Sequence, residues 1–218
     1  MDLVVLAKEP VPGRVKTRLC PPCSPAEAAR VAAAALADTL DAALDSGADR
    51  VVLALDGRPG LWCPPGVVVV GQGHGALDRR LAHVWSHGTG RGPALQVGMD
   101  TPQVLAGDLD RAMAALVDER VDAVLGPATD GGWWALGMRH PRPEAVLGVP
   151  TGRPDTGARQ AARLAELGLR TGLLDPHTDI DTWSDAVAVA NRAPGTQVAA
   201  VVESLAAELI PAASGTGL

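Results

Sequence analysis

Short continuous runs of apolar residues recur along the chain and predict buried strands. They are continuous rather than alternating, which is typical of strands covered on both faces of a parallel sheet. The predicted strands cover residues 3–7, 51–55, 67–70, 93–97, 121–125 and 170–174.

Segments with helical spacing of apolar positions separate these runs. The first begins at Ser24-Pro25-Ala26-Glu27, which combines a Ser cap, Pro at the first helical position and Glu in the capping-box position. Alternating strands and helices predict an α/β fold with a doubly wound sheet. The predicted helices cover residues 25–46, 76–87, 109–117, 158–167, 183–190 and 197–209.

The length of 218 residues fits one α/β domain, which we place at residues 1–210. Residues 211–218 are expected to form a disordered tail. Because the chain has no Phe or Tyr and five Trp, the core has to be built from Ala, Val and Leu. With so few aromatic residues, the position of each Trp helps to distinguish core packing from a binding site.

The formal net charge of −6 argues against a nucleic-acid or membrane-surface partner, since both favour a basic face. No apolar run approaches the roughly 20 residues of a membrane span. The first strand begins almost at once and leaves no room for a signal peptide. We expect a cytoplasmic protein.

Two metal-like spacings lack the partners that a site needs. Cys20-Pro-Pro-Cys23 has the C-x-x-C spacing, but no second C-x-x-C is present and the motif lies in a Pro-rich loop. His83 and His87 stand four residues apart without the Glu of a zinc helix. Both pairs are interpreted as non-functional.

A basic loop follows the first predicted strand. Pro10, Pro12 and Gly13 exclude a helix there, and four of the 19 bases fall within residues 8–18 of an acidic chain. The carboxyl end of a strand is where ligands bind in open α/β sheets. A soluble surface loop is the alternative, but the concentration of positive charge favours an anion site, formed by Lys8, Arg14, Lys16 and Arg18.

Asp100 follows a predicted central strand and precedes a Thr-Pro turn, a position suited to a divalent metal. The alternative is that its carboxylate only caps the turn. The D-x-D sequence of Asp108 and Asp110 resembles a metal motif, but it lies at a predicted helix start, where capping explains it.

The loop after residue 125 contains Gly126-Pro-Ala-Thr-Asp130-Gly131-Gly132-Trp133-Trp134. Two glycines let the backbone approach a ligand closely, and Asp130 can bind an acceptor hydroxyl or amine, or the metal. One Trp is expected to enter the core while the other lines the pocket.

The segment Ala7-Lys-Glu-Pro-Val-Pro-Gly-Arg-Val-Lys-Thr-Arg-Leu19 resembles the opening motif of the glycosyltransferase-A-like family known as domain of unknown function 2064. Its Lys-Thr-Arg-Leu part is also similar to 2-phospholactate guanylyltransferases, and molybdenum-cofactor guanylyltransferases are related. Gly98-Met-Asp-Thr-Pro102, residues 126–137 and Thr178-Asp-Ile-Asp-Thr182 are similar to further motifs of this superfamily.

The resemblance implies a single-domain glycosyltransferase-A fold (Rossmann-like, of the nucleotide-diphospho-sugar transferase type) with a mostly parallel central sheet flanked by helices. It also implies roles. The nucleotide would contact Ala7, Lys8, Gly13, Arg14, Lys16, Gln72 and Arg80, with Lys16, Arg18 and Asp100 catalytic. The acceptor would contact Asp130, Gly131, Gly132, Trp133 and Arg153. Mg²⁺ or Mn²⁺ would be held by Asp100 and Asp181, with Asp179 as the alternative to Asp181.

Two segments depart from the family pattern. Ala76 and Arg79 stand where the family has Asp and Glu, and residues 150–156 replace a Pro-Trp-Ser-Thr-Asp sequence. The first departure affects the specificity of the turn at residues 71–75. The second indicates an acceptor different from the family's commonest one.

The residues indicate nucleotidyl or glycosyl transfer with a nucleoside phosphate. The dense cations and the Lys-Thr-Arg-Leu likeness to guanylyltransferases favour a metal-dependent nucleotidyltransferase, in which a small phosphorylated acceptor attacks a nucleoside triphosphate and pyrophosphate leaves. A glycosyltransferase that uses a nucleotide sugar is the first alternative. A nucleotide-binding protein that has lost catalysis is the second. Expected partners are a nucleotide and a small-molecule acceptor, without nucleic acid or membrane, and a homodimer is left open.

Overall fold

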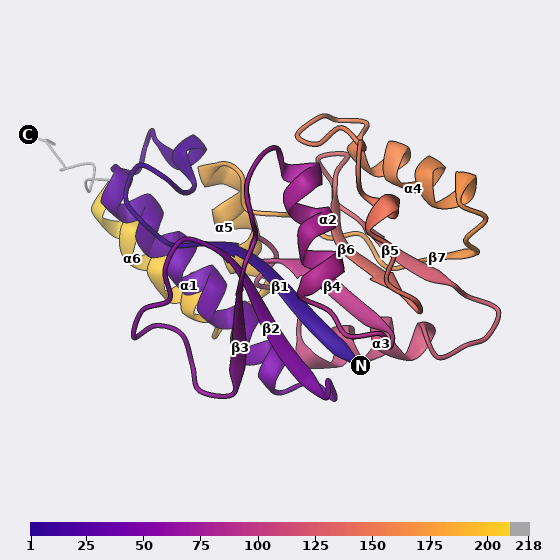
Figure 1. Cartoon of the computed structure of the whole chain (residues 1–218). Coiled ribbons are helices and arrows are strands. Elements are labelled where there is room, and N and C mark those ends of the chain that lie inside the picture. Colours follow the sequence, from indigo (N-terminus) through magenta and orange to yellow (C-terminus); the bar gives the residue numbers. More distant parts are fainter. Residues whose placement is uncertain (210–218) are drawn as a thin grey trace, which may run out of the picture.

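Seven strands form one sheet in the computed structural model, which describes residues 1–209. The sheet order is β3-β2-β1-β4-β6-β5-β7, and β6 is antiparallel to both of its neighbours while the other strands run parallel (Figure 1). The predicted tail at 211–218 lies outside the described residues. The strands are β1 (Asp2–Lys8), β2 (Arg50–Asp56), β3 (Val67–Gly71), β4 (Ala94–Gly98), β5 (Ala123–Pro127), β6 (Trp133–Met138) and β7 (Thr171–Leu173).

Six α-helices accompany the sheet in the described part of the chain. The Ser24 side chain accepts a hydrogen bond from the Glu27 N–H, and the Glu27 carboxylate accepts one from the Ser24 N–H, so the predicted capping box is confirmed. The helices are α1 (Pro25–Leu44), α2 (Leu77–His87), α3 (Ala106–Ala115), α4 (Thr156–Glu166), α5 (Trp183–Arg192) and α6 (Gln197–Leu209).

The helices form layers on both faces of the sheet. Leu3, Val5 and Ala7 of β1 pack in one core with α1 and α3, while Val4 faces α2. A second core joins the outer side of α1 to α5 and α6, and Figure 1 shows α6 beside α1. The cores consist mainly of Ala, Val and Leu, as predicted, and Trp85 and Trp134 are buried.

The chain order of the strands reverses at β1. The chain proceeds from β1 to β2 and β3 on one side, then returns to place β4 on the other side of β1. A reversal of this kind opens a crevice at the carboxyl ends of the two central strands, which is where open α/β sheets bind ligands. The basic loop after β1 and Asp100 after β4 both emerge at this crevice.

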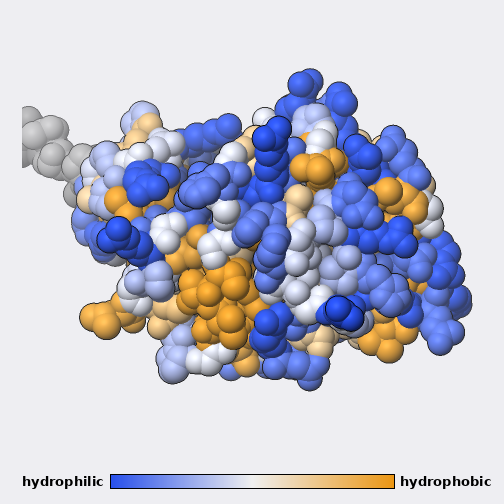
Figure 2. Space-filling view, in the orientation of Figure 1, coloured by the Kyte–Doolittle hydropathy of each residue, from blue (hydrophilic) through white to orange (hydrophobic). Residues whose placement is uncertain are grey.

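Figure 2 shows an apolar patch over the edge strand β3. Within this strand, Val68 and Val69 are 42% and 38% exposed. None of the helices within residues 1–209 is both long and apolar enough to cross a membrane.

Candidate functional site

The basic loop is anchored by buried apolar residues and presents its cations to the crevice. Val15 and Leu19 are buried, while Arg14 and Arg18 are exposed. Lys16 has φ of 48°, a left-handed conformation that is costly for a residue with a side chain. Its ammonium lies 2.5 Å from Asp100 Oδ1 and also donates to the Ile180 carbonyl. These contacts hold the basic loop against Asp100, which follows β4, and against Ile180.

A cavity of about 340 Å³ occupies the crevice. This size lies within the range of small-molecule sites. The cavity combines the predicted cations with apolar side chains from β1, α2 and the end of β4. Its lining residues are Leu6, Ala7, Lys8, Arg14, Val15, Lys16, Thr17, Arg18, Gln72, Leu77, Arg80, Met99, Asp100 and Asp181.

The segment of residues 178–181 carries Asp179 and Asp181, of which Asp181 lines the cavity, and several hydrogen bonds hold it in place. The Ile180 N–H donates to the Asp100 carbonyl at 2.9 Å, and the Gln103 amide donates to the Thr178 carbonyl at 2.6 Å. Arg192 of α5 donates to the Thr178 hydroxyl. Each contact joins residues distant in sequence, so the placement of Asp179 and Asp181 depends on the whole fold.

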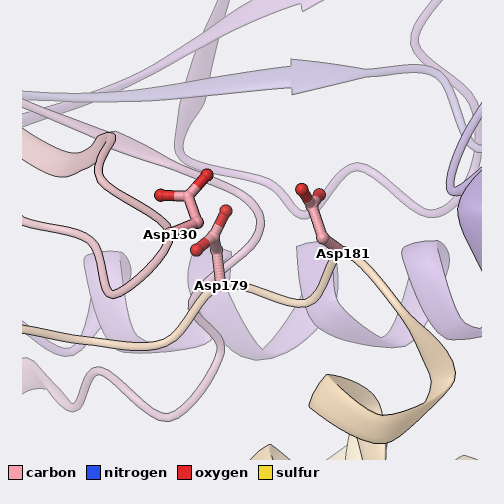
Figure 3. A group of neighbouring side chains, drawn as sticks. All are labelled: Asp130, Asp179 and Asp181. Atoms are coloured by element: carbon pink, nitrogen blue, oxygen red, sulfur yellow. The ribbon is translucent and has the colours of Figure 1, made fainter. Parts of the chain in front are cut away.

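Three carboxylates form a group beside this segment. Each of Asp130, Asp179 and Asp181 offers one oxygen, and these oxygens lie within 4.8 Å of one another. Figure 3 shows Asp179 and Asp181 on one extended segment and Asp130 on a separate turn, with the carboxylates of Asp130 and Asp179 side by side. Asp181 also accepts a hydrogen bond from Arg18 at 2.8 Å.

The electrostatics of this group favour a bound cation. Burial, together with the negative charges of Asp130, Asp181 and Asp100, raises the pKa of Asp179 to about 6. Carboxylate oxygens are the ligands that Mg²⁺ and Mn²⁺ prefer. The donor chemistry and the mutual repulsion therefore fit a divalent metal, which would remove the repulsion.

The sequence prediction and the structure group the acids differently. We expected Asp100 and Asp181 to share the metal, whereas Asp130 joins Asp179 and Asp181 in the structure and Asp100 pairs with Lys16. Asp100 remains close enough for its charge to raise the pKa of Asp179. The metal-binding roles of Asp100, Asp179 and Asp181 stay predictions.

Gln72 and Arg80 form a polar network on the β2 side of the cavity. The Gln72 amide donates to the carbonyls of Ala7 at 2.7 Å and Ala54 at 2.9 Å, and its oxygen accepts from Arg80 Nη1 at 2.8 Å. Arg80 Nη1 also donates to Asp56 at 3.0 Å. Asp56 was not a predicted site residue, although its position at the carboxyl end of a buried strand could have indicated that it lies near the site.

The turn at residues 129–132 packs against the loop that contains Arg153. Gly131 has φ of 90°, and a Cβ atom there would lie 1.9 Å from the Pro154 carbonyl oxygen, so only glycine fits. The Gly157 N–H donates to the Gly131 carbonyl at 2.8 Å. The structure thus brings the predicted acceptor-side residues Asp130, Gly131 and Arg153 into neighbouring loops.

The two adjacent Trp residues face opposite sides of the sheet. Trp134 enters the core beside α1 and α3, and its indole N–H donates to the Asp175 carbonyl at 3.0 Å. Trp133 is half-buried and packs partly against the core on the α4 side. Core entry of one Trp is confirmed, whereas Trp133 is not among the residues that line the main cavity.

The motifs interpreted as non-functional have structural explanations. The Asp108 carboxylate accepts a hydrogen bond from the Leu105 N–H and caps α3, and Asp110 accepts one from the Gly47 N–H. His83 and His87 are exposed and stack on each other. These observations agree with the sequence interpretation.

Comparison with known proteins gives one family and a common fold. The model of a family described as an uncharacterized protein conserved in bacteria (DUF2064) matches residues 28–153. A crystal structure of a "putative nucleotide-diphospho-sugar transferase" from Desulfovibrio desulfuricans G20 has a TM-score of 0.84 at 23% identity and covers 95% of this chain and 96% of that one. No curated protein matches the chain.

Two other solved structures share the fold at lower similarity. A nucleotidyl transferase from Methanothermobacter has a TM-score of 0.57 at 16% identity, covering 87% of this chain and 95% of that one. Rv0371c from Mycobacterium tuberculosis H37Rv, crystallised with manganese, has a TM-score of 0.51 at 23% identity, covering 86% and 96%. The predicted α/β fold with a mostly parallel sheet is confirmed, and it is the fold of nucleotidyl- and sugar-transferase structures.

Proposed function

Because the chain belongs to the DUF2064 family and carries acids and cations around one crevice, we propose that it is a divalent-metal-dependent nucleotidyltransferase. It would transfer a nucleoside monophosphate from a nucleoside triphosphate to a small phosphorylated acceptor. The observation that carries this proposal is the position of the three-carboxylate group beside the basic loop. Such a pairing suits a substrate with a metal-bound polyphosphate.

The basic loop would hold the phosphates. Lys8 and Arg14 form no ion pair within residues 1–209, whereas Lys16 and Arg18 neutralise Asp100 and Asp181. Ammonium and guanidinium groups bind phosphate oxygens through charge-assisted hydrogen bonds. Lys16 and Arg18 would therefore exchange their carboxylate partners for phosphate oxygens when the nucleotide binds.

Asp130, Asp179 and Asp181 would hold Mg²⁺ or Mn²⁺, with Asp100 beside them. When bound, the metal supplies charge neutralisation at phosphate oxygens and orientation of the polyphosphate. The protein groups would fix the reacting atoms relative to one another. Positioning and electrostatics supply most of the barrier reduction in phosphoryl chemistry.

The reaction would proceed by displacement at phosphorus. An acceptor phosphate oxygen forms a bond to the α-phosphorus, the bond from that phosphorus to the α–β bridging oxygen breaks, and pyrophosphate leaves with the electron pair. Gly131, Gly132, Trp133 and Arg153 would contact the acceptor, with the Arg153 guanidinium toward its phosphate. Arg153 is exposed, and within residues 1–209 it forms an ion pair only with Asp155.

Glycosyl transfer is the second candidate, since the fold also matches the structure from Desulfovibrio desulfuricans G20 that is described as a "putative nucleotide-diphospho-sugar transferase". The two reactions release different products from the same kind of site. Nucleotidyl transfer releases pyrophosphate, and glycosyl transfer releases a nucleoside diphosphate.

The test is a product assay with a panel of phosphorylated acceptors, each incubated with the four triphosphates and Mg²⁺ or Mn²⁺. We expect metal-dependent release of pyrophosphate with one triphosphate, and loss of that release in Asp181→Asn. Release of a nucleoside diphosphate from nucleotide sugars, with no pyrophosphate from any triphosphate, would replace the proposal with glycosyl transfer.

A further inference from the structure

The two edges of the sheet differ in their protection against pairing with a further strand. An edge strand leaves a row of backbone N–H and C=O groups free, and proteins commonly shorten such strands or place charges and prolines on them. The β7 edge has only three residues and directly follows Arg170, which forms an ion pair with Asp122. The β3 edge has five residues, Val67–Gly71, and none of them is charged or a proline. Of the two edges, β3 is therefore the one that can accept another strand.

The outward-facing hydrogen-bonding groups of β3 belong to alternate residues. The Gln72 N–H donates to the Leu55 carbonyl at 3.3 Å and therefore faces β2. Because successive residues of a strand direct their backbone groups to opposite sides, the even-numbered residues of β3 also bond to β2, whereas Val67, Val69 and Gly71 direct theirs away from the sheet. Within residues 1–209 no strand pairs with that side of β3. These groups are thus available to a strand of another molecule.

The surroundings of the β3 edge are apolar and uncharged. Val68 and Val69 are exposed, within the apolar region that Figure 2 shows over this strand. Leu44 at the end of α1 is also exposed, and it lies beside Gly66, where a Cβ atom would be 3.7 Å from the Leu44 side chain. Residues 59–73 contain no charged side chain and no histidine. Two copies of a chain with a net charge of −6 repel each other, and this edge adds nothing to that repulsion.

A second copy of the chain fits this edge, because antiparallel pairing of a strand with itself about a two-fold axis is self-complementary. With the axis at the central residue of β3, Val69 of one copy lies opposite Val69 of the other. Their outward-facing N–H and C=O groups then bond to each other. On the α2 side of the sheet, Val68 of one copy lies opposite Val70 of the other. Pairs of β-branched residues directly opposite each other stabilise antiparallel strands.

We propose that the chain forms a homodimer in which β3 pairs with β3 in antiparallel direction, so that the two sheets join into one continuous sheet. The side chains at the interface are those of valine, and the backbone of Val67, Val69 and Gly71 supplies the hydrogen bonds. No residue of β3 lines the main cavity. The dimer and the proposed transfer reaction therefore stand or fall separately.

The test is sedimentation velocity of the full-length protein over a range of concentrations. We expect a species with twice the mass of one chain, whose share rises with concentration. In Val69→Lys, and separately in Val69→Glu, the dissociation constant should rise about tenfold or more, because two like charges meet at the axis. An equimolar mixture of the two variants should recover the dimer, since Lys then faces Glu.

Leu173→Lys places the same charge on the other edge of the sheet and is the matched control, which should dimerise like the wild type. A wild type that stays monomeric would overturn the inference. Dimers of undiminished stability in both Val69 variants would do the same, as would a dimer lost only in Leu173→Lys. Variants that circular dichroism shows to be folded, but whose mixture stays monomeric, would overturn the pairing of Val69 with Val69.

Hydrogen exchange of the wild type tests the same interface without any substitution. As the concentration is raised and the dimer forms, exchange of the Val67, Val69 and Gly71 amide hydrogens should slow, because these groups become hydrogen-bonded. The amides of β7 should exchange at an unchanged rate. Unchanged exchange of the three β3 amides in a dimeric sample would place the interface elsewhere and overturn the inference.

Discussion

The two ends of the sheet hold their carboxylates in opposite ways. At the amino ends of the parallel strands, Asp122 accepts hydrogen bonds from the backbone and guanidinium of Arg170, and Asp2 accepts two from Arg50. The Arg170 hydrogen bonds hold the pKa of Asp122 well below its usual range. These acids are paired and ionised.

At the carboxyl ends the acids lie beside one another. Asp130, Asp179 and Asp181 converge, and burial together with neighbouring negative charge raises the pKa of Asp179 to about 6. A group whose folded pKa is raised destabilises the folded state when it is ionised. Asp2 and Asp122 at the amino ends are therefore paired with arginines. At the carboxyl ends Asp100 and Asp181 also pair with Lys16 and Arg18. Asp130 and Asp179 form no ion pair within residues 1–209, and a ligand can neutralise their repulsion.

Replacing a carboxylate by an amide at each end of the sheet should give the largest difference in turnover between the two ends. Asp181→Asn should lower metal-dependent turnover by roughly 100-fold or more, because a lost metal ligand removes several kcal/mol of charge stabilisation. Asp122→Asn should leave turnover unchanged. The measurement is the rate of product release for both variants, and equal rates would contradict the assignment of the site.

The next largest effect is expected on nucleotide affinity. Lys16→Met should weaken triphosphate binding by about 10- to 100-fold, since hydrogen bonds to charged groups contribute about 1.5–3 kcal/mol. Arg58, an exposed residue outside the cavity lining, provides the control in Arg58→Met. Calorimetric titration checks both, and unaltered affinity in Lys16→Met would remove this residue from the phosphate site.

The Asp179 carboxylate should destabilise the folded protein when no metal is bound. Ionised Asp179 destabilises the metal-free fold above pH 6, so Asp179→Asn should raise the melting temperature at pH 8 by about 2–4 °C, which corresponds to about 1 kcal/mol after discounting for partial exposure. The gain should shrink toward pH 5, where wild-type Asp179 is protonated. Added Mg²⁺ should stabilise the wild type more than this variant.

A destabilised Asp179→Asn protein at pH 8 without metal would contradict the repulsion described here. Glu27→Gln is the reference variant for this measurement. The capping hydrogen bond at the start of α1 lowers the pKa of Glu27, so this substitution should not raise the melting temperature at pH 8.

The smallest effect belongs to the amino end. Asp122→Asn should lower the free energy of unfolding at pH 7 by at most about 1 kcal/mol, because the pair with Arg170 is exposed to solvent. A lowered folded pKa contributes stability above the unfolded value of about 4 and loses it as the pH falls further. Urea unfolding at pH 7 and pH 3 checks this, and a difference between variant and wild type that grows on acidification would be the contrary result.

The sequence predicted most elements to within a few residues because local signals determine them. The capping box at Ser24 and the apolar runs of β1 and β2 depend on neighbouring residues alone. α3 begins at Ala106 rather than at the predicted 109, since Asp108 caps the Leu105 N–H from inside the first turn. The antiparallel direction of β6 depends on pairing with β4 and β5, which no local pattern encodes.

The sequence predicted many residues that line the cavity, but not how the acidic side chains are grouped in space. The basic loop, Asp100, Gln72, Arg80 and Asp181 do line one cavity. The grouping of Asp130 with Asp179 depends on contacts across more than 40 residues, such as Thr129 with Thr178. Gln72 was expected to contact the nucleotide, but its amide donates to the carbonyls of Ala7 in β1 and Ala54 in β2. These hydrogen bonds depend on how the strands pack, which the sequence alone does not show.

The most direct test of the central claim is a thermal-shift comparison of wild type and Asp181→Asn with each triphosphate, with and without Mg²⁺. A ligand at 100 times its dissociation constant adds about 2.7 kcal/mol to the folded state, which raises the melting temperature by several degrees. We predict such a shift in the wild type with a triphosphate and Mg²⁺ together, and its loss in the variant. An equal shift in both proteins, or no shift with any triphosphate or nucleotide sugar, would contradict a metal–nucleotide site at the carboxyl ends of the strands.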